Sequence, residues 1–127
     1  MCTAISYQTK DHYFGRNLDL EYSYHETVTI TPRNYHFLFR REGELNTHYA
    51  MIGMAYVQEG YPLYYDATNE KGLSMAGLLF AGNAYYSKEE EEGKEHISPF
   101  ELIPWILGQC ESVKEAKQKL VRLQLVE

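Results

Sequence analysis

The chain has only two cysteines, Cys2 and Cys110, among its 127 residues. One such pair does not make the disulfide framework that stabilises small secreted domains. The first residues are polar and aromatic instead of basic and then apolar, so we expect no secretory leader. The sequence therefore predicts a cytoplasmic protein, in which Cys110 is a buried structural thiol.

Positive charge and long apolar runs are equally scarce. Twelve Lys and Arg residues stand against 18 Asp and Glu residues, which gives a net charge of −6. This balance disfavours non-specific binding to nucleic acid or to an anionic membrane surface. No apolar run of the sequence reaches the roughly 18 residues of a membrane span, and the five histidines show no metal-ligand spacing. We expect no nucleic acid, membrane or metal among its partners.

The remaining composition is that of one ordinary folded domain. Hydrophobic residues make up 44% of the chain and charged residues 24%, and the length suits a single core. The unusual feature is a set of 12 tyrosines, which suit strands and the walls of a pocket for an amphipathic ligand. Core packing explains most of them equally well. We find no internal boundary, so residues 1–127 are interpreted as part of a single domain.

Strand patterns occupy about the first two thirds of the chain. The predicted strands are residues 2–7, 13–17, 27–31, 35–39, 49–57, 63–67 and 73–80. The turn-like Thr9-Lys10-Asp11 makes the first two strands a hairpin. Such a hairpin would bring Arg16 and Asp19 within reach of Cys2. The strand at 35–39 is expected to return beside the one at 27–31.

Helix signals follow an acidic run at residues 88–95, which we interpret as a solvated loop. Ser98-Pro99-Phe100-Glu101 combines a cap residue, a proline at the first helical position and a glutamate three residues after the cap. It predicts a helix over residues 99–109, and a second cap at Ser112 predicts another to about residue 126. The apolar stripe of that second helix would be Val113, Ala116, Leu120 and Leu123.

Strands followed by two helices indicate an α+β fold, with the helices on one face of a mainly antiparallel sheet. The second predicted helix reaches the last residue without a cap, a glycine or a polar tail. Its apolar face has few partners in so short a chain. We therefore expect these residues to be the N-terminal piece of a longer protein.

Cys2 is the candidate for chemistry. Its small size favours removal of Met1, which would leave a first residue with both a thiol and an α-amine. Their ordinary pKa values are about 8.5 and about 7.7–8.0. One residue would then supply a nucleophile and a tethered base. An arbitrary residue after the initiator methionine is the simpler interpretation, so the residues around Cys2 decide between the two.

Several separated segments carry a family likeness: Met1-Cys2-Thr3, Phe14–Asp19, Glu21-Tyr22-Ser23, Thr31–Asn34, Tyr49-Ala50, Gly53-Met54, Asn69–Leu73, Ala76-Gly77-Leu78 and Tyr86–Glu89. Together they resemble the choloylglycine hydrolase family, which contains the bile salt hydrolases and penicillin V acylases. The likeness covers essentially the whole chain. It implies the N-terminal nucleophile hydrolase fold, a four-layer αββα sandwich of which this chain would be an incomplete N-terminal portion. It also implies cleavage of a small-molecule, non-peptide amide without a metal or an organic cofactor.

The resemblance implies a role for three residues. Cys2 corresponds to the nucleophile, Arg16 to the arginine next to the thiolate, and Asp19 to the carboxylate that bonds the α-amine. A guanidinium favours the thiolate because it is always charged. A carboxylate would orient the α-amine and stabilise the charge that it acquires as a base. On spacing alone, Arg16 and Asp19 could equally be a surface ion pair.

The family's oxyanion hole is implied only in part. Its backbone N–H donor corresponds to Leu79, where bile salt hydrolases usually have Asn and penicillin acylases Tyr. Leucine keeps the N–H but loses the polar side chain; Asn83 is a nearby alternative. A later asparagine and a later arginine would lie beyond residue 127. Because losing one oxyanion donor costs about 10²–10³ in rate, we expect the chain alone to be inactive.

By position, the substrate pocket would be lined by Leu18, Tyr24, Gln58 and Tyr65. Leu18 and Tyr24 suit a steroid or phenyl acyl group, whereas Tyr65 would narrow the site and Gln58 would add polarity. Ordinary strand or loop residues are the alternative for all four.

The function implied first is hydrolysis of conjugated bile salts to free bile acid and glycine or taurine. A penicillin V acylase or an acyl-homoserine lactone acylase shares the same machinery, and a non-catalytic binding domain is the rival of another class. The resemblance implies a homo-oligomer for the full-length protein.

Overall fold

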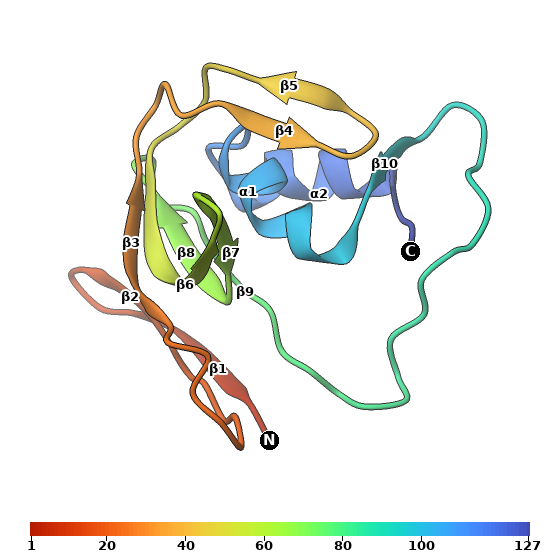
Figure 1. Cartoon of the computed structure of the whole chain (residues 1–127). Coiled ribbons are helices and arrows are strands. Elements are labelled where there is room, and N and C mark those ends of the chain that lie inside the picture. Colours follow the sequence, from red (N-terminus) through yellow and green to blue (C-terminus); the bar gives the residue numbers. More distant parts are fainter.

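A computed structural model describes all residues 1–127 (Figure 1). The strands and helices in chain order are β1 Thr3–Gln8, β2 His12–Asn17, β3 Thr27–Thr31, β4 Phe37–Phe39, β5 Gly43–Leu45, β6 Met51–Gln58, β7 Tyr61–Tyr64, β8 Asp66–Asn69, β9 Ser74–Ala76, β10 Glu95–Ile97, the 3₁₀ helix η1 Pro99–Glu101, α1 Leu102–Leu107, α2 Val113–Val121 and β11 Leu123–Leu125. No helix is long and apolar enough to cross a membrane.

The N-terminal hairpin forms as predicted. Strands β1 and β2 pair antiparallel, with Thr3 opposite Asn17 and Gln8 opposite His12. In Figure 1 this hairpin, in red to orange, stands apart from the helices. The register brings the end of β2 back to the start of β1. Asp19, two residues beyond β2, therefore lies beside the N-terminus.

The main sheet is antiparallel and has five strands in the order β3-β6-β8-β9, with β7 also paired to β6. Strands β7 and β8 follow one another along the same edge of β6. The bend between them is Tyr65, and it splits the single strand predicted at 63–67. Pro62 is accommodated inside β7 because β7 pairs with β6 alone and needs no second set of backbone donors.

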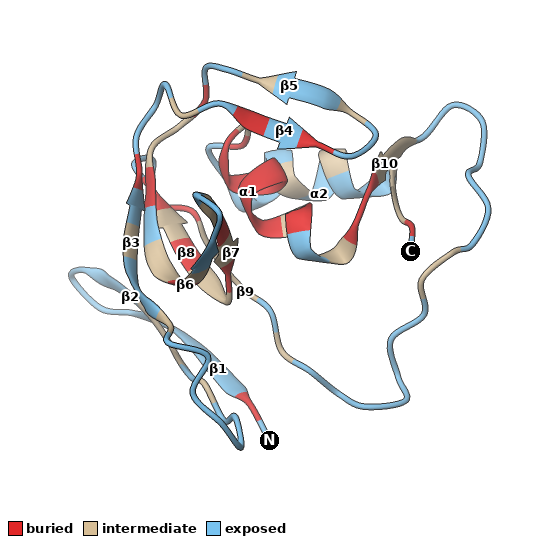
Figure 2. Cartoon of the chain, viewed as in Figure 1, coloured by how far each residue is buried: buried red, intermediate tan, exposed pale blue.

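The buried core lies between the main sheet and α1, as Figure 2 shows. Helix α1 contacts β8 and β9, and five of its six residues are buried. Across the helix, Phe37 and Phe39 of β4 are buried while Leu38 between them is exposed, as the alternation of a strand requires. The opposite face of the sheet leaves Val28, Ile30 and Ile52 exposed.

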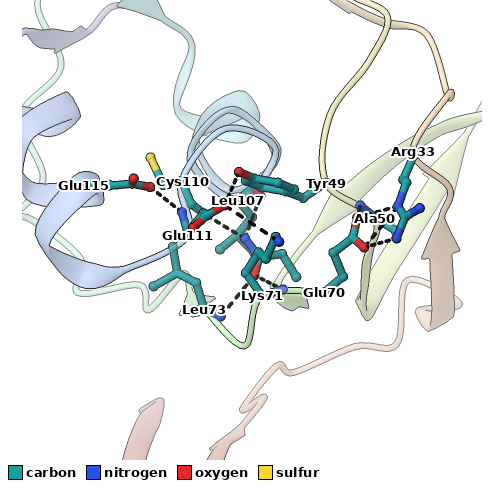
Figure 3. Close-up of polar contacts among 11 residues, drawn as sticks. Arg33, Tyr49, Ala50, Glu70, Lys71, Leu73, Leu107, Cys110, Glu111 and Glu115 are labelled. Carbon is teal, nitrogen blue, oxygen red and sulfur yellow. Dashed lines mark hydrogen bonds and ion pairs between the residues drawn. The ribbon is translucent and has the colours of Figure 1, made fainter.

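The turn after β8 ties the sheet to α1 (Figure 3). Buried Asn69 donates through Nδ2 to the carbonyl oxygens of Leu107 and Cys110, both at 2.8 Å. Its Oδ1 accepts from the Lys71 and Leu73 N–H groups at 3.1 and 3.0 Å. One amide thus satisfies two carbonyls at the end of the helix and two N–H groups of the turn.

The predicted pairing of the strand at 35–39 with that at 27–31 is wrong. Strand β4 pairs with β5, and β3 pairs with β6. The reason is burial: the Phe39 ring contacts Trp105 of α1 edge-on, with centroids 4.8 Å apart, so β4 belongs to the layer of the helices. The predicted strand at 73–80 also shortens, because β9 ends at Ala76 and a long loop follows (Figure 1).

Both predicted helices are shorter than expected. The capping box does open the first, since the Ser98 N–H donates to the Glu101 carboxylate at 3.0 Å. The regular helix ends at Leu107, so Cys110 lies in the following turn, where it is buried. The second helix ends at Val121, and the chain continues as β11, which pairs in parallel with β10.

No residue of α2 is buried. From the predicted stripe, Ala116 and Leu123 pack against the core, whereas Val113 and Leu120 are exposed. The acidic run is mainly loop, as predicted, although its last residue, Glu95, begins β10.

Candidate active site

Cys2 is shielded from solvent next to an exposed hairpin. It is 8% exposed, whereas every residue of β1 is exposed. Asn17, the last residue of β2, bonds to the backbone on both sides of it. Its Oδ1 accepts from the Thr3 N–H at 2.5 Å, and its Nδ2 donates to the Met1 carbonyl at 3.3 Å. The hairpin thus fixes the backbone that carries the thiol.

Contacts around the sulfur favour its ionised form. The pKa of the Cys2 thiol lies below its ordinary value, chiefly because the Asp19 backbone N–H donates to the sulfur. Donation from the Arg16 side chain and from the Leu79 N–H lowers the pKa further, whereas burial acts in the opposite direction. The structure therefore brings Arg16, Asp19 and the Leu79 backbone to the thiol.

The Asp19 carboxylate lies at the chain terminus. With Met1 in place it pairs with the Met1 α-amine, and this contact raises the pKa of that amine. Asp19 thus acts near Cys2 in two ways. Its N–H lowers the pKa of the thiol, and its carboxylate pairs with the α-amine of Met1.

The Arg16 guanidinium is held almost entirely by backbone. Its side chain is 4% exposed. Nε donates to the Asn17 carbonyl at 3.0 Å, Nη1 to the Tyr65 carbonyl at 2.9 Å and Nη2 to the Gly77 carbonyl at 3.0 Å. The only carboxylate that pairs with it is Asp66, whose Oδ2 lies 3.6 Å from Nη1. The Tyr65 carbonyl also accepts from the Gly77 N–H at 2.9 Å, so the edge of the main sheet serves as the cradle for this charge.

Leu79 lies at the start of the loop that follows β9. Its side chain is 74% exposed, and its backbone N–H lowers the pKa of the Cys2 thiol. A backbone N–H beside a nucleophilic sulfur is the kind of donor that stabilises an oxyanion formed there.

The four expected substrate residues do not share one cavity. Leu18 borders an open cavity of about 520 Å³ together with Arg16. The Tyr65 carbonyl accepts from Arg16, and burial chiefly raises the pKa of the Tyr65 phenol. Gln58 borders a separate hollow beside Phe100. Leu18 therefore shares a cavity with Arg16, Gln58 borders a different one, and Tyr24 is exposed.

Sequence reasoning missed Asn17, Asp66 and the carbonyls of Tyr65 and Gly77, which accept from Arg16. Asn17 stands inside a segment that carried the family likeness, without a role of its own. Asp66 offered a signal, because aspartate is depleted in strands and here begins one. The carbonyls of Tyr65 and Gly77 offered none, since every residue has a carbonyl. No group of three or more His, Cys, Asp or Glu side chains is placed to hold a metal ion.

Comparisons with known proteins relate the whole chain to one family of hydrolases. Residues 2–127 match the family model of the linear amide C–N hydrolases, choloylglycine hydrolase family. The chain is 58% identical over 126 residues to the bile salt hydrolase/transferase of Lactiplantibacillus plantarum, covering 99% of this chain and 39% of that protein. It is 41% identical over 130 residues to the bile salt hydrolase/transferase of Clostridium perfringens, covering 100% and 40%.

A solved structure is similar over the whole chain. The C2A mutant of the conjugated bile acid hydrolase from Clostridium perfringens matches with a TM-score of 0.91 at 40% identity, covering 100% of this chain and 40% of that one. The predicted fold class is confirmed by this likeness. The chain spans about two fifths of the length of the relatives that it matches.

Proposed function

The chain belongs to the choloylglycine hydrolase family of linear amide C–N hydrolases, and from this premise we propose that the protein hydrolyses conjugated bile salts with Cys2 as its nucleophile. The products are free bile acid and glycine or taurine. The observation that carries the proposal is the shielded Cys2 thiol, whose pKa is lowered by the Asp19 N–H, the Arg16 side chain and the Leu79 N–H. The relatives named bile salt hydrolase/transferase support the choice of substrate.

Removal of Met1 precedes the reaction and converts the Cys2 nitrogen into an α-amine. Asp19, whose carboxylate already pairs with an α-amine one residue earlier, would orient the new one. The Cys2 thiolate attacks the amide carbonyl, forming a C–S bond and an oxyanion that the Leu79 N–H stabilises.

The tetrahedral intermediate then loses its amine. The protonated α-amine of Cys2 gives its proton to the departing nitrogen, the C–N bond breaks, and an acyl thioester remains on Cys2. The neutral α-amine next takes a proton from water as the water attacks the thioester. The C–S bond breaks, and the acid and the thiolate are released.

The protein acts on a small molecule in the cytoplasm as a homo-oligomer, without nucleic acid or membrane as a partner. A penicillin V acylase or an acyl-homoserine lactone acylase is the second candidate, because the residues around Cys2 serve any linear amide. The apolar, exposed Leu79 side chain offers no polar contact to distinguish these substrates.

Parallel assays of the whole protein on glycocholate, taurocholate, penicillin V and an acyl-homoserine lactone test the proposal. We expect turnover of the two bile salts, loss of it in Cys2→Ala, and its retention in the control Cys110→Ala. The 127-residue chain alone should be inactive. Turnover of penicillin V or the lactone without the bile salts would select the second candidate. Binding of bile salts without hydrolysis of any substrate would indicate a non-catalytic domain.

A further inference from the structure

The carboxylate of Asp66 lies beside the one cation that contacts the Cys2 thiol. It is the residue on β8 that follows the bend at Tyr65, and its Oδ2 is 3.6 Å from Nη1 of Arg16. We propose that Asp66 acts on Cys2 through Arg16: its negative charge offsets part of the guanidinium charge and so sets how strongly Cys2 attacks. This inference rests on the proposed function, in which Cys2 is the nucleophile.

The geometry divides two tasks between two sets of groups. Three carbonyl oxygens, of Asn17, Tyr65 and Gly77, accept from Arg16 at 2.9–3.0 Å and fix its orientation. Asp66 makes no hydrogen bond to Arg16, so its contribution is electrostatic. Its other oxygen, Oδ1, accepts from the Met54 N–H at 3.3 Å, which anchors the carboxylate to β6.

Both partners are shielded from solvent. The Arg16 side chain is 4% exposed and that of Asp66 22%, so salt and water weaken their attraction less than they would at the surface. The other charged or titratable groups around the guanidinium are the Cys2 thiol, Asp19, the terminal α-amine and Glu26, which borders the same cavity. Asp66 is the carboxylate among them that pairs with Arg16.

Thiolate chemistry gives this pairing a purpose. The intrinsic reactivity of a thiolate falls as its pKa falls, and a thiol whose pKa lies near the ambient pH reacts fastest. At Cys2, one cation and two backbone N–H groups all favour the thiolate. A counter-charge on Arg16 limits their combined effect. Asp66 therefore keeps the sulfur basic enough to attack a poorly reactive amide.

The test measures thiol–disulfide exchange of Cys2 against pH. The whole protein without Met1, verified by its intact mass, reacts with a small disulfide reagent. Mass spectrometry of the N-terminal peptide follows Cys2 separately from Cys110. In Asp66→Asn we expect the midpoint of the pH profile to move to lower pH. The rate on the high-pH plateau should fall by roughly threefold for each pH unit of that movement.

Three further variants separate charge from structure. Asp66→Glu, which retains the charge, should keep the wild-type profile, and Asp66→Ser should repeat the shift if the amide variant does not fold. Asp11→Asn, the same change in the turn at the far end of the hairpin, should leave the midpoint in place. In an Arg16→Met background, Asp66→Asn should lose its effect, because the proposed influence passes through the guanidinium.

An unchanged midpoint in both Asp66→Asn and Asp66→Ser, or a movement to higher pH, would overturn the inference. The same holds if the shift persists in the Arg16→Met background. These outcomes are independent of hydrolysis. If the whole protein cleaves no amide while Asp66→Asn shifts the profile, the proposed function alone fails. If Cys2 is acylated by substrate while the profile stays fixed, this inference alone fails.

Discussion

The backbone of Asp66 crosses Gly53 so closely that a Cβ on Gly53 would lie 2.0 Å from the Asp66 carbonyl oxygen. The next atoms it would meet belong to the backbone of Ala67 and Asp66, at 2.6 and 2.8 Å, so no flexible side chain could give way. The absence of a side chain at Gly53 thus lets β8 approach β6 and brings Asp66 beside Arg16.

Gly53→Ala should therefore destabilise the sheet. We expect the free energy of unfolding to fall by about 1–3 kcal/mol or more, as for other overpacked sites. Gly15→Ala is the matched control, because a Cβ there would meet only the Ile5 side chain at 4.0 Å. Urea denaturation of both variants checks this expectation. Equal stability of the two would contradict the close approach.

Asn17→Ala should slow acylation of Cys2. The Asn17 amide bonds to the Thr3 N–H and to the Met1 carbonyl. After removal of Met1 only the bond to the Thr3 N–H is left, and Asn17→Ala removes it. Because small misplacements of a reacting group are costly, we expect a loss of at least roughly tenfold in kcat/KM. Asn46→Ala is the control, since the Asn46 amide only contacts Glu44 in an exposed turn. An unchanged kcat/KM in Asn17→Ala would show that the hairpin alone positions Cys2.

The β8–β9 turn should make stability depend on acid. The Arg33 side chain, and then the Ala50 N–H, lower the pKa of Glu70 from 4.5 to about 2 (Figure 3). The unfolded chain therefore binds a proton that the folded chain does not, and stability is lost as the pH falls from about 4.5 towards 2. In Glu70→Gln this part of the loss should be absent. Urea denaturation at several pH values, with Glu44→Gln as an exposed control, measures it; parallel curves for Glu70→Gln and wild type would contradict the pairing.

Asn69→Ala should cost more than an ordinary polar truncation. It leaves the buried carbonyls of Leu107 and Cys110 without their donor. We expect about 2 kcal/mol or more of lost stability, from about 1–3 kcal/mol for each unsatisfied buried group. Asn83→Ala, in the exposed loop, should change stability little. Thermal unfolding of both variants provides the comparison, and a similar midpoint for the two would show that water replaces the lost amide.

The parts of the fold that were predictable from sequence are those that local pattern determines. The hairpin formed because its turn and alternation agree over adjacent residues, and its register placed Arg16 and Asp19 near Cys2. The partner of β4 was not predictable, since it depends on Phe39 meeting Trp105 from a distant helix. The end of α2 was missed for the same reason: its last residues become a strand only because β10 lies beside them.

The candidate site divides in the same way. Residue types could be chosen from sequence, but the atoms they use could not. The Asp19 N–H, and not only its carboxylate, acts near Cys2. The carbonyls of Tyr65, in the bend before β8, and of Gly77, just after β9, hold Arg16 together with that of Asn17. Such contacts depend on backbone geometry that no side-chain pattern records. The cavity borders likewise separate Gln58 from Leu18, although position alone grouped them.

The most direct test of the central claim is the mass of the N-terminal peptide. The whole protein is mixed with glycocholate and quenched in acid during turnover, and the peptide is then analysed. The account predicts a peptide that begins at Cys2, without Met1, and that carries one cholyl group, which is absent in Cys2→Ala. Two results would contradict it. One is a peptide that retains Met1. The other is a peptide that stays unmodified under single-turnover conditions, together with hydrolysis of glycocholate by Cys2→Ala at an undiminished rate.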